Sequence, residues 1–329
     1  MDVLSRTLPA GDLGTRQGRR FLIAIGLATG LPWLLLPAFG SGSGTGAHML
    51  LQLAYVAGPP HVISTYGLYF DPDLRPLMRA QRVRFIYGPI VILATVPLFF
   101  WLASPQVAAL GFLLAGAWAT FHFSRQNVGV LAFVFAGRNS RRLDARERRL
   151  LDFVGIAGVA GIVAYSDSLH TADLGFLQSS ATFAAVAGTV AIVIHGAPLV
   201  WRRRDDLVCC AFLLQSMVFF VPLFMMRNSA ALPYGAAHGF QYLVFVGFLV
   251  KHERGGVRRP HWPLVVSTLA ITVVGGVAMV LMRRTDDVVL LGIIVAISAN
   301  HYLFDASIWR IRDPLQRRYV TERFAFVSR

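Results

Sequence analysis

Long apolar runs constrain this chain most, because about ten of them can each cross a hydrocarbon layer of ~30 Å. They predict membrane-spanning helices at 21–39, 48–70, 85–103, 107–136, 149–166, 180–201, 207–226, 232–250, 262–282 and 287–309. With 55% hydrophobic and 15% charged residues, the 329-residue chain is too apolar for a soluble protein. We therefore expect an all-α, polytopic transmembrane helix bundle that forms one integral membrane domain over 1–329.

The basic residues are divided very unequally between the two sides of these predicted spans. If the N-terminus is cytoplasmic, nearly all of the 31 Lys and Arg residues fall in inner segments, and only Arg227, Arg283 and Arg284 fall in outer ones. Cytoplasmic loops of membrane proteins carry such an excess. The net charge of +14 therefore reflects topology, and we expect no nucleic-acid partner. The pattern predicts a bacterial-type inner membrane protein with both termini cytoplasmic, a polar N-terminal segment 1–20 and a basic C-terminal tail 310–329.

Four histidines lie inside predicted spans: His61, His122, His238 and His301. Ionisable side chains at bilayer depth are costly and usually face a bundle interior. All four spans run from outside to inside, and at 1.5 Å of rise per residue the four depths agree within roughly 9 Å. Metal sites in helix bundles take their ligands from facing helices, so the sequence predicts a metal site here. The alternative for each histidine is an interhelical hydrogen bond. His195 is an outer candidate, for which a structural role is favoured.

Polar side chains follow each of these histidines within about one helical turn. Such groups orient the second ring nitrogen of a ligand or complete the metal shell themselves. The candidates are Ser64, Thr65, Gln126, Gln241, Asn300 and Asp305. Tyr66, Tyr242 and Tyr302 are candidate donors of a hydrogen bond or a proton to the reacting atoms. Arg125 is the one strong charge deep in a span, and an ion pair with Asp305 is the simplest way to house both.

Segments around the four histidines resemble the Brp/Blh family of membrane carotenoid cleavage dioxygenases. The similar segments are GPPHV at His61, TFHFSRQN at His122, HGFQY at His238 and NHYLFDASIWR at His301. The resemblance implies that His61, His122 and His238 bind iron, and that His301 lies in or beside the site together with Asp305.

Three positions differ from the pattern of that family. Thr65 and Gln126 stand where the family has acidic residues, and Tyr242 stands where it has a histidine. Imidazoles with a carboxylate suit non-heme Fe(II), although Zn, Cu or Mn would accept the same atoms. The resemblance and the donor set together lead us to expect an iron oxygenase that uses O2.

The expected substrate is an apolar molecule from the bilayer, such as a carotenoid-like polyene, a quinone or an acyl lipid, since the site would be reached through membrane lipids. Two other classes of function remain open. One is a transporter or proton-relay protein without a metal, in which the glycines of GPP at 58–60 and GG at 275–276 would mark broken helices. The other is a structural membrane subunit, in which polar residues only lock helices together.

Overall fold

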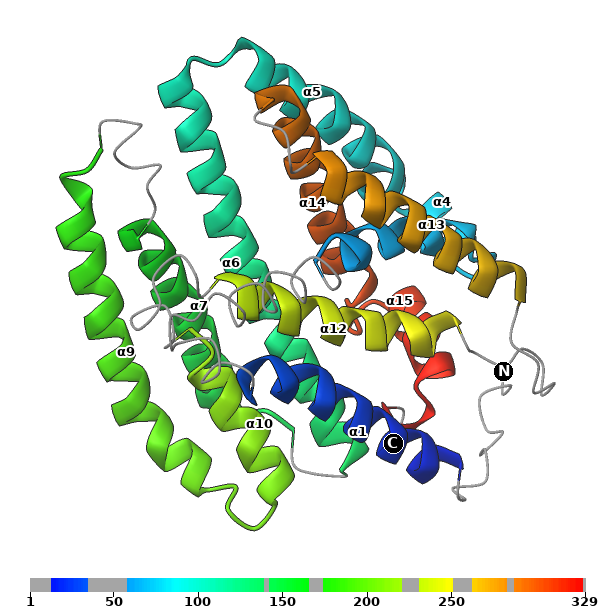
Figure 1. Ribbon diagram of the computed structural model, residues 1–329. Coiled ribbons are helices and arrows are strands. Elements are labelled where there is room, and N and C mark those ends of the chain that lie inside the picture. Colours follow the sequence, from blue (N-terminus) through cyan, green and yellow to red (C-terminus); the bar gives the residue numbers. More distant parts are fainter. Residues whose placement is uncertain are drawn as a thin grey trace.

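The computed structural model describes residues 13–34, 58–138, 142–165, 174–220, 231–250, 262–282 and 287–327, and these ranges are helical with no strand (Figure 1). The elements are a helical segment 58–67, α1 (Leu13–Leu34), η1 (Leu68–Phe70), α4 (Arg75–Ala80), the π-helix η2 (Val83–Tyr87), α5 (Gly88–Leu102), α6 (Pro105–Gly137), α7 (Ala145–Tyr165), α9 (Leu177–Trp201), α10 (Leu207–Met217), α12 (Ala231–Val250), α13 (Trp262–Met282), α14 (Val288–Ile308), α15 (Pro314–Arg323) and η4 (Ala325–Val327).

Five helical stretches among the described residues are long and apolar enough to cross a membrane. They are Val83–Leu102, Pro105–Ala136, Leu177–Trp201, Leu264–Met282 and Val288–Ile308. Large apolar side chains on these helices point outward; Trp101, Phe183 and Val274 are 68%, 76% and 69% exposed. Lipid would cover such faces, so the protein has the character of a multi-pass membrane protein. The count of ten spans exceeds these five, and it stays a prediction, as does the side on which the termini lie.

Helices α6, α12 and α14 meet in the middle of the molecule. Figure 1 shows α7, α9 and α10 on one side of α6, and α5, α13 and α14 on the other. Helices α1 and α12 lie side by side across the centre, where both contact α6. Helices α6, α12 and α14 each carry one of the predicted histidine ligands, which are His122, His238 and His301. The fold therefore places the candidate site between its two halves.

Small residues bring the segment 58–67 very close to α13. A Cβ added at Gly275 would lie 2.5 Å from Ile63 Cγ2, and one added at Gly67 would lie 2.7 Å from the Cα of Thr268. Helix α13 is continuous through Gly275 and Gly276. The expectation that this pair of glycines breaks a helix is therefore wrong. Their role is the close helix approach that small residues permit in membrane bundles.

The two terminal segments are more ordered than the sequence predicted. Helix α1 begins at Leu13, so the described part of the predicted polar segment 1–20 is helical. The predicted tail 310–329 contains α15 and η4, which pack into the core. The ring of Phe324 lies 4.9 Å from that of Phe133 on α6, and the ring of Phe326 lies 5.3 Å from that of Phe21 on α1. These aromatic contacts are the physical reason that the segment is not a free tail.

A buried ion pair links this C-terminal segment to the turn after η1, which follows the helical segment 58–67. Arg323 Nη2 lies 2.8 Å from Asp71 Oδ2 and 2.9 Å from Asp73 Oδ2. The hydroxyl of Tyr319 donates to the same Asp71 oxygen at 2.8 Å. Burial raises the pKa of Tyr319 well above its usual value, so the phenol keeps the hydrogen that it donates. Removing one partner of such a buried pair leaves an uncompensated charge.

Asp206 caps the N-terminus of α10. Its carboxylate accepts the backbone N–H of Cys209 at 3.2 Å and the Nε of Arg138 at 3.3 Å. Burial alone would raise the pKa of Asp206, but these hydrogen bonds and the charge of Arg138 outweigh it, and the net effect is a lowered pKa. The folded protein therefore favours the ionised cap.

Candidate metal centre

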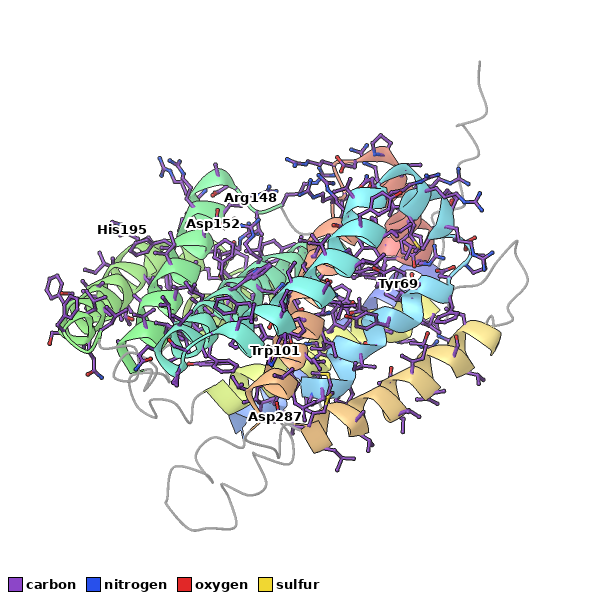
Figure 2. All side chains as sticks on the ribbon, turned by 90° about the horizontal axis from the view of Figure 1, so that it is seen from above. Tyr69, Trp101, Arg148, Asp152, His195 and Asp287 are labelled. Atoms are coloured by element: carbon purple, nitrogen blue, oxygen red, sulfur yellow. The ribbon has the colours of Figure 1, made fainter. Side chains whose placement is uncertain are left out.

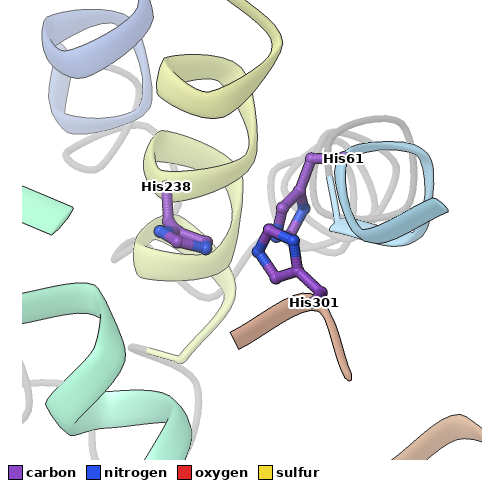
Figure 3. Close-up of side chains that lie close together, drawn as sticks. All are labelled: His61, His238 and His301. Carbon is purple, nitrogen blue, oxygen red and sulfur yellow. The ribbon is translucent and has the colours of Figure 1, made fainter. Parts of the chain in front are cut away.

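The four histidines predicted to share one level do meet in the structure. The centroid of the His61 ring lies 4.7 Å from that of His238 and 4.9 Å from that of His301. The ring of His122 lies 5.0 Å from His238 and 5.3 Å from His301. All four side chains are buried, with at most 7% of their surface exposed. Figure 3 shows His61, His238 and His301 reaching from three separate helical segments into one small space.

The spacing of the rings can be compared with the spacing of imidazole ligands around a single ion. A metal that is bonded to an imidazole nitrogen at about 2.1 Å lies roughly 3.2 Å from the ring centre. Two ligands at angles between 90° and 109° then have ring centres about 4.5–5.2 Å apart. The distances of 4.7, 4.9 and 5.0 Å fall in that interval, that of 5.3 Å lies just above it, and the 6.1 Å between the rings of His238 and His301 lies well above it. Binding of one ion by all of these rings would therefore require a rearrangement of the side chains.

Two overlapping sets of ligand atoms lie within metal-binding reach. One atom each from His61, His238 and His301 lies within 4.8 Å of the others, and the same limit holds for His122, His301 and Asp305. His301 belongs to both sets. The resemblance implied His61, His122 and His238 as ligands, whereas the first of these sets has His301 in place of His122. That the histidines bind a metal stays a prediction, but the donor atoms required for it are gathered.

Several ring nitrogens in this cluster have no hydrogen-bond partner among the described residues. They are Nε2 of His122, Nε2 of His301 and both ring nitrogens of His238. A buried polar atom left without a partner costs about 1–3 kcal/mol. A bound cation would satisfy such lone pairs directly, because the neutral imidazole nitrogen is a common metal ligand. These unpartnered atoms are the observation that most favours a ligand in the cluster.

One polar neighbour contacts a histidine ring as the sequence predicted, but on a different helix. Thr65 follows His61 by one turn, and its Oγ1 lies 2.7 Å from Nδ1 of His301. The same oxygen lies 2.9 Å from the hydroxyl of Tyr242 on α12. Thr65 and Tyr242 are each only 1% exposed. A continuous hydrogen-bonded chain therefore runs from His301 through Thr65 to Tyr242.

The predicted ion pair between Arg125 and Asp305 is wrong. Arg125 points away from the site and forms its ion pair with Asp152 on α7, where both side chains are about half exposed. Asp305 is buried and accepts a hydrogen bond from Nε1 of Trp309, the residue that caps the C-terminal end of α14. Its other carboxylate oxygen lies 3.6 Å from Nε2 of His122. Asp305 therefore remains available to the centre, and Arg125 does not belong to it.

The amide side chains lie beside the cluster without contacting its rings through a hydrogen bond. Gln126 Nε2 donates to the backbone oxygen of His238 at 3.0 Å and to Oε1 of Gln241 at 3.1 Å. Gln241 Nε2 donates in turn to Oγ1 of Thr29 on α1 at 2.8 Å. Asn300 Nδ2 donates to the carbonyl of Pro89 at 3.2 Å. These residues hold helices together, which is a structural role and not the ring-orienting role that was expected.

Aromatic rings cover the remaining faces of the histidines. Tyr302 stacks on His122 with centroids 4.3 Å apart, and Phe123 packs on His238 at 4.2 Å. The hydroxyl of Tyr66 donates to the backbone oxygen of Ile297 at 3.4 Å, so this hydrogen bond does not reach a histidine ring. His195 is exposed on α9, and Figure 2 shows it at an edge of the molecule.

The sequence did not predict the hydrogen bond from Trp309 to Asp305 or the ion pair of Arg125 with Asp152. Trp309 stands four residues after Asp305, about one helical turn, and this spacing was an available signal. Comparison of the chain with protein-family models, with curated proteins and with solved structures finds no match in any of the three.

Proposed function

We propose that this chain is a multi-pass membrane metalloenzyme, an oxygenase that holds Fe(II) with buried histidines and acts on an apolar substrate. The observation that carries the proposal is the cluster of His61, His238 and His301, joined by His122 and Asp305. Within the described residues, Nε2 of His122, Nε2 of His301 and both ring nitrogens of His238 have no hydrogen-bond partner. Imidazoles with one carboxylate are a donor set that suits non-heme iron. The segments similar to the Brp/Blh family surround the same residues.

The proposal includes ten spans, cytoplasmic termini and a bacterial inner membrane. In the view of Figure 2, Arg148 and Asp152 lie in the upper part of the molecule, and Trp101 and Asp287 lie below them. That separation is what the predicted orientation requires, because Arg148 belongs to a predicted inner segment and Asp287 to an outer one. Apolar side chains exposed on α5, α9 and α13 would contact lipid, from which a polyene, quinone or acyl chain would enter.

The residues of the site would have different roles in this function. Bound iron would supply a position at which O2 can be activated. His61, His238 and His301 would hold the ion. Asp305, oriented by its hydrogen bond from Trp309, faces His122 and could bind the ion or accept a proton. Phe123 and Tyr302 pack against the histidine rings and exclude water from the site. An apolar substrate fits such walls better than a polar one.

Metal content tests the proposal directly. The protein would be purified in mild detergent and bound metals measured by mass spectrometry, beside His301→Ala and, as a matched control, His195→Ala on the exposed face of α9. We expect about one iron per chain in the wild type and the control, and loss in His301→Ala. A wild type without stoichiometric metal after growth in several metal supplements would overturn the proposal. Iron-loaded protein would then be screened with polyenes, quinones and acyl lipids for O2-dependent products.

A further inference from the structure

The single hydroxyl hydrogen of Thr65 gives a direction to the chain that joins His301, Thr65 and Tyr242. In one arrangement Tyr242 donates to Thr65, Thr65 donates to Nδ1 of His301, and the hydrogen of the imidazole lies on Nε2. In the other, Nδ1–H of His301 donates to Thr65, Thr65 donates to Tyr242, and Nε2 carries a lone pair. Only the second arrangement allows Nε2 of His301 to bind a metal ion.

We propose that Thr65 and Tyr242 are positioning residues that hold His301 in this metal-binding tautomer. Thr65 accepts the hydrogen of Nδ1 at 2.7 Å and donates to Tyr242 at 2.9 Å, and Tyr242 is the terminal acceptor. The inference rests on the proposed function, because it takes His301 as a ligand. It also changes the role of Tyr242, which becomes an acceptor behind a ligand instead of a proton donor to the reacting atoms.

The surroundings of the three hydrogen-bonded residues keep their hydrogen bonds in place. His301 is fully buried and Thr65 and Tyr242 nearly so, so water does not compete for their hydrogen bonds. Thr65 Oγ1 makes no third hydrogen bond within the described ranges, so its hydrogen is committed to one of the two partners. The Tyr242 ring packs edge-on against His301 with centroids 4.6 Å apart, which holds the imidazole in place. Thr65 is β-branched, and its side chain therefore has few rotamers to choose from.

Both residues depart from the pattern of the family that the chain resembles. An acidic residue in place of Thr65 would accept the Nδ1 hydrogen by itself, whereas a threonine needs an acceptor for its own hydrogen. Tyr242 supplies that acceptor. Thr65 and Tyr242 therefore act together, and neither residue is expected to work alone.

The test compares Thr65→Val, which keeps the shape but lacks the hydroxyl, with Thr65→Ser, which keeps the hydroxyl, and with Tyr242→Phe. Affinity for Zn(II), a diamagnetic probe, would be measured by competition with a chelator in detergent. Loss of such an orienting partner typically costs 10–100-fold in metal affinity, so we expect about that loss in Thr65→Val. Thr65→Ser should restore binding. Tyr242→Phe should bind no more tightly than Thr65→Val, because Thr65 is then released to donate to Nδ1 and to favour the wrong tautomer.

Nitrogen-15 spectra of histidine-labelled protein, with His301 assigned from His301→Gln, give a readout that a purely structural role would not change. Zn-loaded wild type should carry hydrogen on Nδ1 of His301. Tight binding in the wild type with unchanged affinity in Thr65→Val would overturn the inference and leave the proposed function standing. A wild type that binds no metal would end the proposed function. The metal-free spectra would then decide: hydrogen on Nδ1 of His301 in the wild type, lost in Thr65→Val and restored in Thr65→Ser, supports the inference, and hydrogen on Nε2 in the wild type or no change in Thr65→Val overturns it.

Discussion

Replacing Gly67 by alanine tests whether the contact with α13 positions the helical segment that carries His61 and Thr65. An added Cβ would lie 2.7 Å from both Cα and Oγ1 of Thr268 and 2.8 Å from its Cγ2, whereas ordinary contacts lie at 3.4–4 Å. The two helices must therefore separate by at least about 0.7 Å, the difference between 3.4 and 2.7 Å. A rotamer change cannot remove the overlap, because one of the contacted atoms belongs to the backbone.

Overpacking of this kind costs about 1–3 kcal/mol, and the backbone contact places Gly67→Ala near the upper end. The matched control is Gly129→Ala on α6, where an added Cβ meets nothing within 4 Å. In a helix interior that change gains roughly 0.5–1 kcal/mol, because alanine loses less backbone entropy than glycine on folding. The same chemical substitution should therefore shift stability in opposite directions at the two positions.

The assay is thermal unfolding in mild detergent, followed by tryptophan fluorescence, together with metal content at room temperature. We expect a lower apparent Tm for Gly67→Ala and an unchanged or higher one for Gly129→Ala. Metal content should fall in Gly67→Ala even in the folded fraction, since moving His61 by a few tenths of an ångström disturbs the ligand geometry. A Gly67→Ala protein with the stability and metal content of the control would refute the reasoning.

Three further substitutions have expected outcomes. His238→Ala should lower metal content and leave the fold intact, as judged by circular dichroism and gel filtration, because its ring nitrogens serve no other described residue. Arg323→Met should cost about 3–5 kcal/mol in thermal unfolding by leaving a buried carboxylate unpaired, whereas Arg318→Met, in an exposed pair, should cost at most about 1 kcal/mol. Asp206→Asn should destabilise the protein near neutral pH. The folded pKa of Asp206 is lowered, so its contribution is complete above the unfolded value of ~3.9 and disappears as the pH falls through the folded value. The difference in free energy of unfolding between the wild type and Asp206→Asn should therefore shrink as the pH is lowered. A difference that stays constant with pH would contradict the role of the ionised Asp206 as a cap.

The level of the candidate site was predictable, because the rise per residue of a helix is constant and His61, His122, His238 and His301 lie at similar distances from predicted helix ends. The rotation of each helix about its axis was not predictable from one sequence. The polar residues that follow each histidine were expected to serve that same histidine. Thr65 follows His61 but bonds His301, and Gln126 follows His122 but bonds the backbone of His238. Packing between helices decides these partners.

The error over Arg125 has the same origin. Its position deep in a span suggested a buried partner, and Asp305 was the nearest carboxylate by depth. The structure pairs Arg125 with Asp152, because α7 follows α6 in the chain and packs along it. Hydropathy shows where a helix runs and how much of it is apolar, but it does not show which face meets the neighbouring helix. The packed C-terminal segment was missed for a related reason: Phe324 and Phe326 lie in too short a run to predict burial.

Polar side chains are unevenly distributed along the two helices that carry His122 and His301. From Val107 to Ala119, α6 is wholly apolar, and from Val288 to Ala299, α14 has Ser298 as its sole polar side chain. Both stretches precede the histidine of their helix, on the predicted outer side. Beyond the histidines, polar residues continue on the other side through Gln126 and Asp305. A transported ion needs polar groups on both sides of its binding site. On these two helices the polar residues next to the histidines lie mainly on one side, so a path for protons or ions along α6 and α14 would lack polar groups on the other side.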